Sequence, residues 1–184
     1  VSPMIRFVLY LGAGATLPCH SSGSIGLSWP EICFVSILAA WCINLFNFMD
    51  GVDGFATTQA MLVAVGLGFL AHRNLGDPSA LSNICIIIVT ALIPMLWLNW
   101  PPAKMFLGDA GAVPLGFMMA LIGMLAFNQS QSLGFAWAVL MMPFLMDATI
   151  TLLLRITNGD VWYLPHNDHA YQRLARLYGG ALPV

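Results

Sequence analysis

Long apolar runs separated by short polar breaks dominate this chain of 184 residues. A bilayer core takes about 20 mostly apolar residues per spanning helix. The stretches of roughly that length are 29–49, 54–71, 80–98, 110–127 and 133–154, and a shorter run at 4–17 could be a partial span. Backbone polar groups in lipid need partners within their own segment, so each span should be helical. We expect an all-α, polytopic integral membrane protein with about five to six transmembrane helices.

The breaks between these runs are rich in Pro, Gly, Ser and Asn, which commonly interrupt helices. After Leu154 the chain becomes polar, aromatic and basic. No internal repeat or low-complexity tract divides it. We therefore expect a single membrane-embedded domain over 1–184, in which 156–184 form a cytoplasmic segment.

Composition supports a membrane location. Hydrophobic residues make up 59% of the chain and charged residues 8%, whereas soluble domains carry about 25% charged residues. The net charge of −2 offers no basic surface for nucleic acid. The four cysteines show no C-x-x-C spacing, and we expect them to be buried free thiols.

Basic residues are shared unevenly between the two sides of the membrane. When the helices are threaded alternately, only Arg73 falls on one side. The other side receives Arg6, Lys104, Arg155, Arg173 and Arg176. An excess of basic residues marks the cytoplasmic side. The same threading brings the acidic loops and the histidine-containing segment to this cytoplasmic face.

The first polar cluster lies in "NLFNFMDGVDGFATTQA", residues 44–60. Asn47, Asp50 and Asp53 follow one another at intervals of three residues and offer oxygen ligands of the kind that Mg²⁺ accepts. Asp53 could instead cap the helix that starts near Gly54, and Asp50 could be a solvated loop residue.

The second cluster lies in "PPAKMFLGDAGAVPLGF", residues 101–117. Asp109 falls where a helix of small residues begins, and Lys104 adds a cation nearby. A helix N-terminus after a glycine attracts phosphate, and an aspartate there can hold a metal that bridges to phosphate. A simple N-cap is the alternative for Asp109.

The third cluster is "HNDHAYQR", in which His166 and His169 can share one helical face. They could donate to phosphate oxygens, bind zinc or lie inert at the membrane surface, and Arg173 favours an anion. Together the three clusters suggest a phosphate or pyrophosphate ligand bound through Mg²⁺.

The three motifs, in this order and spacing, resemble the polyprenyl-phosphate N-acetylhexosamine-1-phosphate transferases (glycosyltransferase family 4). The resemblance is to the bacterial type that initiates O-antigen and related surface glycans, and it covers about residues 44–174. It implies transfer of a HexNAc-1-phosphate from a UDP-sugar to undecaprenyl phosphate in the bacterial inner membrane, with release of UMP. The reaction would use Mg²⁺, with Mn²⁺ able to substitute, and would take place at the cytoplasmic face. A homodimer is compatible with this resemblance.

The resemblance also assigns roles to individual residues. Asn47 and Asp109 would contact Mg²⁺ or pyrophosphate, Asp50 would line the catalytic pocket and Asp53 would lie near the nucleotide base. The implied catalytic set is Asp50, Asp53, Asp109, His166 and His169. The implied substrate contacts are Asn47, Asp53, Asn99, Lys104, Phe106 and Arg173.

Two departures from the family pattern and three alternative functions accompany these expectations. Asp168 stands where the family often has a small polar residue, and the family's Asp-Asp pair on an earlier loop is absent, so Val1 is expected to be an internal start. The peptidoglycan enzyme that uses UDP-MurNAc-pentapeptide is the alternative within the family. A transporter or channel subunit, with Asp147 lining an ion path, and an inactive truncated product are the others.

Overall fold

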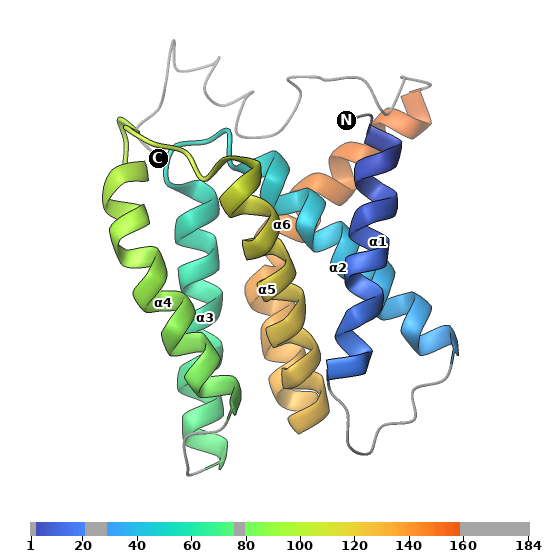
Figure 1. Ribbon diagram of the computed structural model, residues 1–184, viewed down its shortest axis with the longest axis vertical. Helices are drawn as coiled ribbons and strands as arrows, with labels where there is room; N and C mark the ends of the chain where they lie inside the picture. Colours follow the sequence, from blue (N-terminus) through green and yellow to red (C-terminus); the bar gives the residue numbers. More distant parts are fainter. Residues whose placement is uncertain (1–2, 21–28, 76–79, 159–184) are drawn as a thin grey trace.

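The computed structural model describes residues 3–20, 29–75 and 80–158. Every regular element in these ranges is a helix, which confirms the all-α expectation (Figure 1). The helices are α1 (Pro3–His20), α2 (Trp29–Met49), α3 (Phe55–Leu75), α4 (Ala80–Asn99), α5 (Gly108–Gln129) and α6 (Gln131–Asn158).

Four helices of the described part are long and apolar enough to cross a membrane. They are α2, α4 and α5 over their full lengths and α3 over Phe55–Asn74. The first helix, α1, contains a shorter apolar stretch at Val8–Leu17. The expected span at 133–154 lies within α6, a helix of 28 residues. The described residues thus have the character of a multi-pass membrane protein, with four spans by length and composition.

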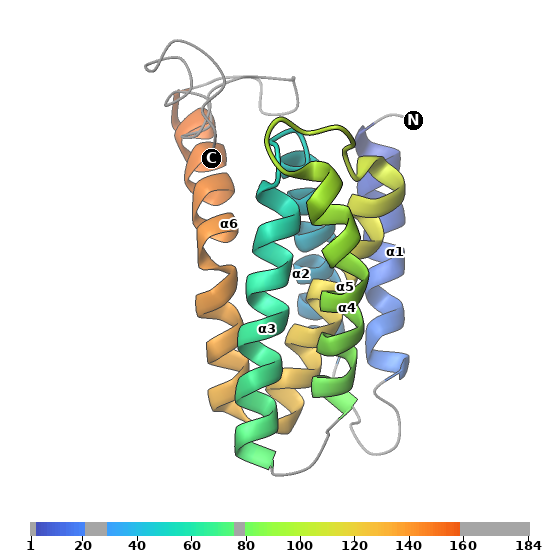
Figure 2. The same ribbon diagram turned by 90° about the vertical axis from the view of Figure 1, so that its left-hand side faces the viewer.

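The helices pack as two groups joined through α5 and α6. One group is α1, α2 and α5, in which α2 crosses the others at an angle (Figure 1). The other group is α3, α4 and α6, seen side-on in Figure 2. Small residues permit the closest approach: a β-carbon on Gly116 of α5 would lie 2.5 Å from the Ile43 Cα of α2. The backbones of α2 and α5 therefore touch at this point.

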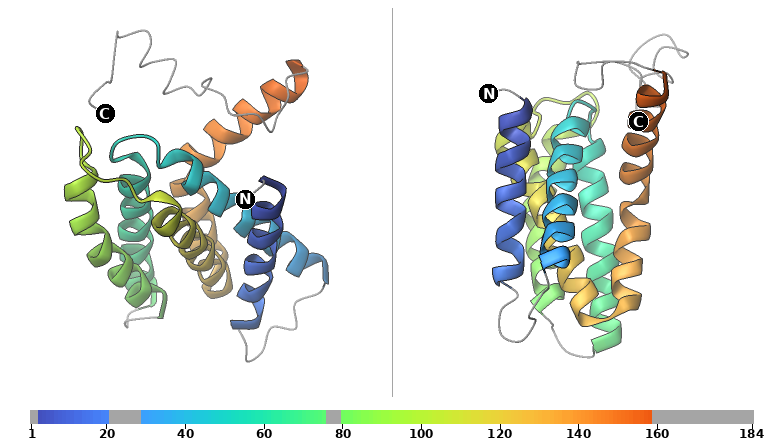
Figure 3. Two further views of the ribbon diagram at one scale, coloured as in Figure 1. Left: turned by 45° about the horizontal axis from the view of Figure 1, so that its top comes forward. Right: turned by 90° about the vertical axis from the view of Figure 1, so that its right-hand side faces the viewer.

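Aromatic and polar contacts hold α6 against the bundle. Phe144 of α6 packs between Phe46 and Phe55, with ring centroids 5.0 and 4.9 Å apart. The side chain of Gln59 in α3 donates a hydrogen bond of 2.6 Å to the Leu140 carbonyl. Pro143 lies one turn further along α6, where its ring and missing N–H disturb the helical ladder. Beyond this region α6 leans away from the other helices (Figures 1 and 3).

The outward surface of the bundle is strongly apolar, as a lipid-facing surface should be. Trp29, Trp97 and Trp100 are exposed near helix ends, where tryptophan commonly lies at the interface between membrane and water. Cys42 and Cys85 are buried free thiols as expected. The expectation of burial is wrong for Cys33, whose side chain is exposed, because none of the described helices covers Cys33 and its exposed neighbour Phe34 on α2.

Candidate active site

Two connecting loops meet at one end of the bundle, the α2–α3 loop at residues 50–54 and the α4–α5 loop at residues 100–107 (Figures 1 and 2). The sequence places the first acidic cluster in one and the start of the second cluster in the other. Gly54 has a φ of +70° and Gly108 a φ of +60°, a region that side chains strongly disfavour. These two glycines let the loops turn sharply into α3 and α5.

Asp50 joins the two loops. Its carboxylate accepts hydrogen bonds from the backbone N–H of Leu107, at 3.1 Å, and of Gly108, at 2.6 Å. These N–H groups lie at the start of α5, where no intrahelical partner exists for them. The anion at this helix N-terminus is therefore a side chain of the protein. Asp50 is buried, so it is not the solvated loop residue of the simplest interpretation.

Burial raises the pKa of the Asp50 carboxyl above its ordinary value. The two backbone N–H donors lower that pKa and offset part of the rise, and the nearby Asp109 carboxylate adds to the rise. Burial disfavours the charged form of an acid, whereas hydrogen bonds to that form favour it. Asp50 is therefore a carboxylate held at some cost in the polar contact between residues 50–54 and residues 100–108. We call this contact the joint.

Asp53 and Asn99 complete the joint. Asp53 accepts a hydrogen bond of 2.9 Å from the Ala103 N–H, so it binds the opposite loop, and the interpretation of Asp53 as a cap of α3 is wrong. Asn99 performs that task from the end of α4, because its Oδ1 accepts from the Gly54 N–H at 3.0 Å. The Asn99 amide also binds the Thr57 hydroxyl and the Met105 carbonyl.

Asp109 differs from these residues because its side chain is exposed. The N-cap position of α5 is Leu107, without a side-chain cap hydrogen bond, so the N-cap alternative for Asp109 is wrong. Its carboxylate lies 3.6 Å from the Arg6 guanidinium of α1. Both side chains are substantially exposed, and such a surface pair contributes little stability. A carboxylate in this position is free to face a ligand.

The remaining described candidates lie around the same joint. Lys104 and Phe106 are exposed on the α4–α5 loop, and Asn47 is half-buried near the end of α2. Among the residues of known placement, no three His, Cys, Asp or Glu side chains form a ready metal cage. Mg²⁺ needs no such cage, because it keeps several waters and substrate oxygens beside one or two protein ligands. The exposed Asp109 carboxylate and the Asn47 amide fit that chemistry as oxygen donors.

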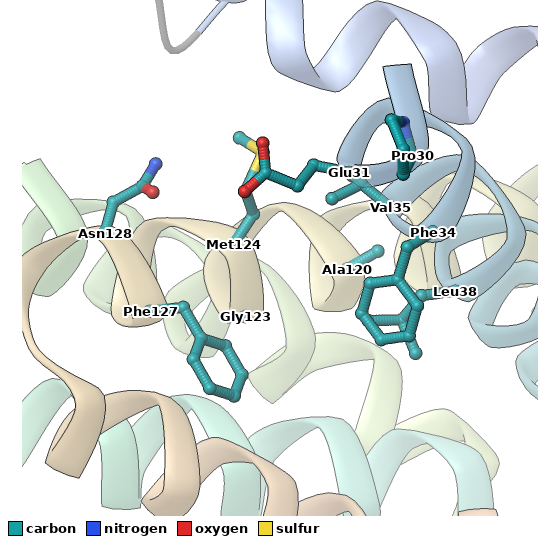
Figure 4. A pocket seen from close by; sticks show the side chains of 10 residues that line it. All are labelled: Pro30, Glu31, Phe34, Val35, Leu38, Ala120, Gly123, Met124, Phe127 and Asn128. Carbon is teal, nitrogen blue, oxygen red and sulfur yellow. The ribbon is translucent and has the colours of Figure 1, made fainter. Parts of the chain in front are cut away.

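Some predicted features lie elsewhere. His166, His169 and Arg173 fall outside the described residues, as does the whole segment 159–184. Asp147 is half-buried in α6. A cavity of about 370 Å³ lies at the opposite end of the bundle, between the start of α2 and the end of α5 (Figure 4). Its lining is mainly apolar, with Glu31 and Asn128 among the lining residues, and it has no contact with the joint.

Sequence reasoning missed the partners that make the joint. Thr57 carried no signal, because a threonine in an apolar run looks like a packing residue. Arg6 was counted only for orientation, although it faces Asp109. The backbone N–H groups of Ala103, Leu107 and Gly108 have no signature in side-chain patterns. Only the glycines beside them hinted that backbone would approach a polar group.

Comparison with known proteins agrees with this picture. The family model of glycosyl transferase family 4 matches residues 2–127. A phospho-N-acetylmuramoyl-pentapeptide-transferase of Clostridium perfringens is 34% identical over 116 residues, which cover 63% of this chain and 36% of that protein. The same enzyme of Acinetobacter baylyi is 32% identical over 160 residues, 77% of this chain and 41% of that protein.

A relative with a different name matches as well. A probable undecaprenyl-phosphate N-acetylglucosaminyl 1-phosphate transferase of Bacillus subtilis is 27% identical over 152 residues, covering 80% of this chain and 41% of that protein. The chain thus spans about two fifths of the length of these curated relatives. The match of the family model over residues 2–127 includes the first two motifs and confirms the family resemblance, and the chain belongs to glycosyl transferase family 4.

Proposed function

We propose that this protein transfers a HexNAc-1-phosphate from a UDP-sugar to undecaprenyl phosphate, with release of UMP. The product would be the first lipid-linked intermediate of a surface glycan, such as a lipopolysaccharide or another cell-envelope polymer. One observation carries the proposal. The family's two acidic loops are locked together at one end of an apolar bundle, with Asp109 exposed beside the joint.

In this proposal a phosphate oxygen of the lipid attacks the β-phosphorus of the donor. The bond between that phosphorus and the bridging oxygen breaks, and UMP leaves. Mg²⁺ held by Asn47 and Asp109 would neutralise charge on the phosphates. Lys104 offers a further cation, and Phe106 an exposed ring for the nucleotide base. The proposed location is the bacterial inner membrane, with the site facing the cytoplasm. UDP-sugars are made in the cytoplasm.

A second donor has equal support. The relatives from Clostridium and Acinetobacter are named for a muramoyl-pentapeptide donor, whereas the relative from Bacillus is named for N-acetylglucosamine. We therefore propose UDP-MurNAc-pentapeptide as the alternative donor, which would place the protein in peptidoglycan synthesis. The two donors share the uridine, both phosphates and an N-acetylated hexose, so the described loops serve either.

The test is UMP release by the natural full-length protein in detergent with undecaprenyl phosphate and each UDP-sugar in turn. We expect Asp109→Ala to lower kcat about 100-fold or more, the usual cost of removing a group that stabilises transition-state charge. Glu31→Ala is the matched control, because it removes an exposed acid at the other end of the bundle. Full activity of Asp109→Ala would refute the site, and absence of UMP release from both donors would refute the function.

A further inference from the structure

The deepest polar contact of the joint lies between Asn99 and Thr57. Both side chains are fully buried, at the point where the end of α4 meets the first turn of α3. Asn99 Oδ1 accepts from the Gly54 N–H and from the Thr57 hydroxyl, each at 3.0 Å. Asn99 Nδ2 donates to the Met105 carbonyl at 2.9 Å. One amide therefore connects α3, α4 and the α4–α5 loop.

The partners determine how this amide is oriented. A backbone N–H can only donate and a backbone carbonyl can only accept, so Gly54 must face the oxygen of Asn99 and Met105 its nitrogen. The Thr57 hydroxyl donates its proton to the same oxygen. It fills the second acceptor position of a carbonyl that is closed off from water, and so restrains the amide in the orientation that Gly54 and Met105 set.

The Asn99 amide helps to hold an exposed part of the α4–α5 loop, residues 104–106, in place. The α4–α5 loop is held at Ala103 by Asp53, at Met105 by Asn99, and at Leu107 and Gly108 by Asp50. Between these anchors the side chains of Lys104, Met105 and Phe106 are exposed. The N–H groups of Lys104 and Met105 also donate to the Leu98 carbonyl, at 2.8 and 3.2 Å. The Asn99 amide adds a side-chain hydrogen bond at Met105 to this backbone contact.

We propose that Thr57 is a positioning residue for the donor site. Its hydroxyl restrains the Asn99 amide in the orientation that Gly54 and Met105 set, and that amide helps to hold the exposed 104–106 surface in the shape that receives the nucleotide of the UDP-sugar. The inference rests on the proposed function, because it assigns this surface to the donor. Thr57 itself is buried and touches no substrate.

The decisive variant is Thr57→Val, which keeps the shape of the side chain and removes the hydroxyl. We expect the KM for the UDP-sugar to rise about three- to ten-fold, the size of effect expected from one neutral hydrogen bond, while kcat changes less than about two-fold. A higher KM with an unchanged kcat marks a loss of binding that ground state and transition state share. Thr57→Ser restores the hydroxyl and should restore the KM.

Thr90→Val is the matched control. Thr90 is a threonine of α4 whose hydroxyl bonds only to the Ile86 and Ile87 carbonyls of its own helix. We expect it to leave both kinetic constants unchanged. Unaltered kinetics in Thr57→Val would overturn the proposal. So would a parallel fall of kcat and Tm at constant KM, because that pattern describes a purely structural residue.

Hydrogen exchange separates this inference from the proposed function. Thr57→Val should speed amide exchange in residues 103–108 relative to the parent and to Thr90→Val, whether or not a donor is turned over. If the parent releases no UMP from either donor, the proposed function fails. Faster exchange with rescue by serine would then still support the positioning role of Thr57, and unchanged exchange would overturn it.

Discussion

Asp50 shows how one side chain can be both costly and necessary. Burial opposes its negative charge, yet that charge accepts the two N–H groups that open α5. A neutral aliphatic residue would leave both donors without this partner in a partly buried contact, at a cost of at most roughly 1–3 kcal/mol for each unsatisfied group. The loop geometry around Asp109 therefore depends on the Asp50 carboxylate.

The raised pKa of Asp50 predicts an unusual pH dependence. An ordinary aspartate titrates near pH 4. Because the folded-state pKa is higher than the unfolded one, the folded protein binds more protons between the two values, and the free energy of unfolding falls as pH rises through that window. Most surface-paired aspartates act in the opposite direction.

Asp50→Asn tests this dependence, since asparagine has no carboxyl to titrate. We expect the Tm difference, parent minus variant, to be largest near pH 4 and to shrink as pH rises. Thermal unfolding in detergent across pH 4–8 measures it. Titrating groups remote from Asp50 are common to both proteins and cancel in the difference. A Tm difference that is flat with pH, or that grows with it, would contradict the assignment.

At the scale of whole helices, close packing of α2 on α5 relies on Gly116. Its missing β-carbon would lie 2.5 Å from the Ile43 Cα and 2.8 Å from the Cys42 carbonyl oxygen. Those are backbone atoms of a neighbouring helix, so they cannot move aside as a flexible side chain can. Small residues that let backbones approach are the usual basis of helix association in membranes.

We expect Gly116→Ala to destabilise the protein by about 1–3 kcal/mol, the usual cost of overpacking. Unfolding in a denaturing detergent, followed by circular dichroism, measures the change. Gly12→Ala is the control, because nothing lies within 4 Å of its would-be β-carbon and alanine is the better helix former. Equal stability of Gly116→Ala and the parent would show that α2 and α5 can separate at this contact without cost.

Helices were more predictable than their contacts. The run 29–49 coincides with α2 because Trp29-Pro30 and Asp50-Gly51 interrupt the apolar pattern sharply at both ends. The run 54–71 was too short, because His72 and Arg73 break the pattern although α3 continues to Leu75. A helix can leave the apolar layer without unwinding, so hydropathy marks the lipid contact and misses the helix end.

The candidate site was predictable in part. Residue types and loop order placed Asp50 and Asp53 on the same side of the membrane as the α4–α5 loop. The chain crosses the membrane twice between the two loops, through α3 and α4, and so returns to the same side. Their roles were not predictable, because the decisive partners are backbone N–H groups and the amide of Asn99, 45 residues from Gly54. Patterns of side chains carry no information about such partners.

At the scale of the molecule, the described candidate site residues lie at one end of the bundle. Arg6, Lys104 and the joint of the two loops lie together, whereas Arg73 is exposed at the far end of α3. A donor that carries two phosphates needs water and cations on its side of the membrane. The distribution of basic residues predicts that this side is the cytoplasm.

Thiol labelling tests this orientation directly. In a background without the four native cysteines, Lys104→Cys should react with a membrane-impermeant maleimide in inverted vesicles and stay unlabelled in intact cells. Arg73→Cys, at the other end of the bundle, should show the reverse and serves as the matched control. UMP release by the Arg73→Cys protein shows that the labelled molecules are folded. If Lys104→Cys were labelled from outside the cell, the joint would face away from the pool of UDP-sugars. The proposed transfer would then be impossible in the membrane, however well the loops fit its chemistry.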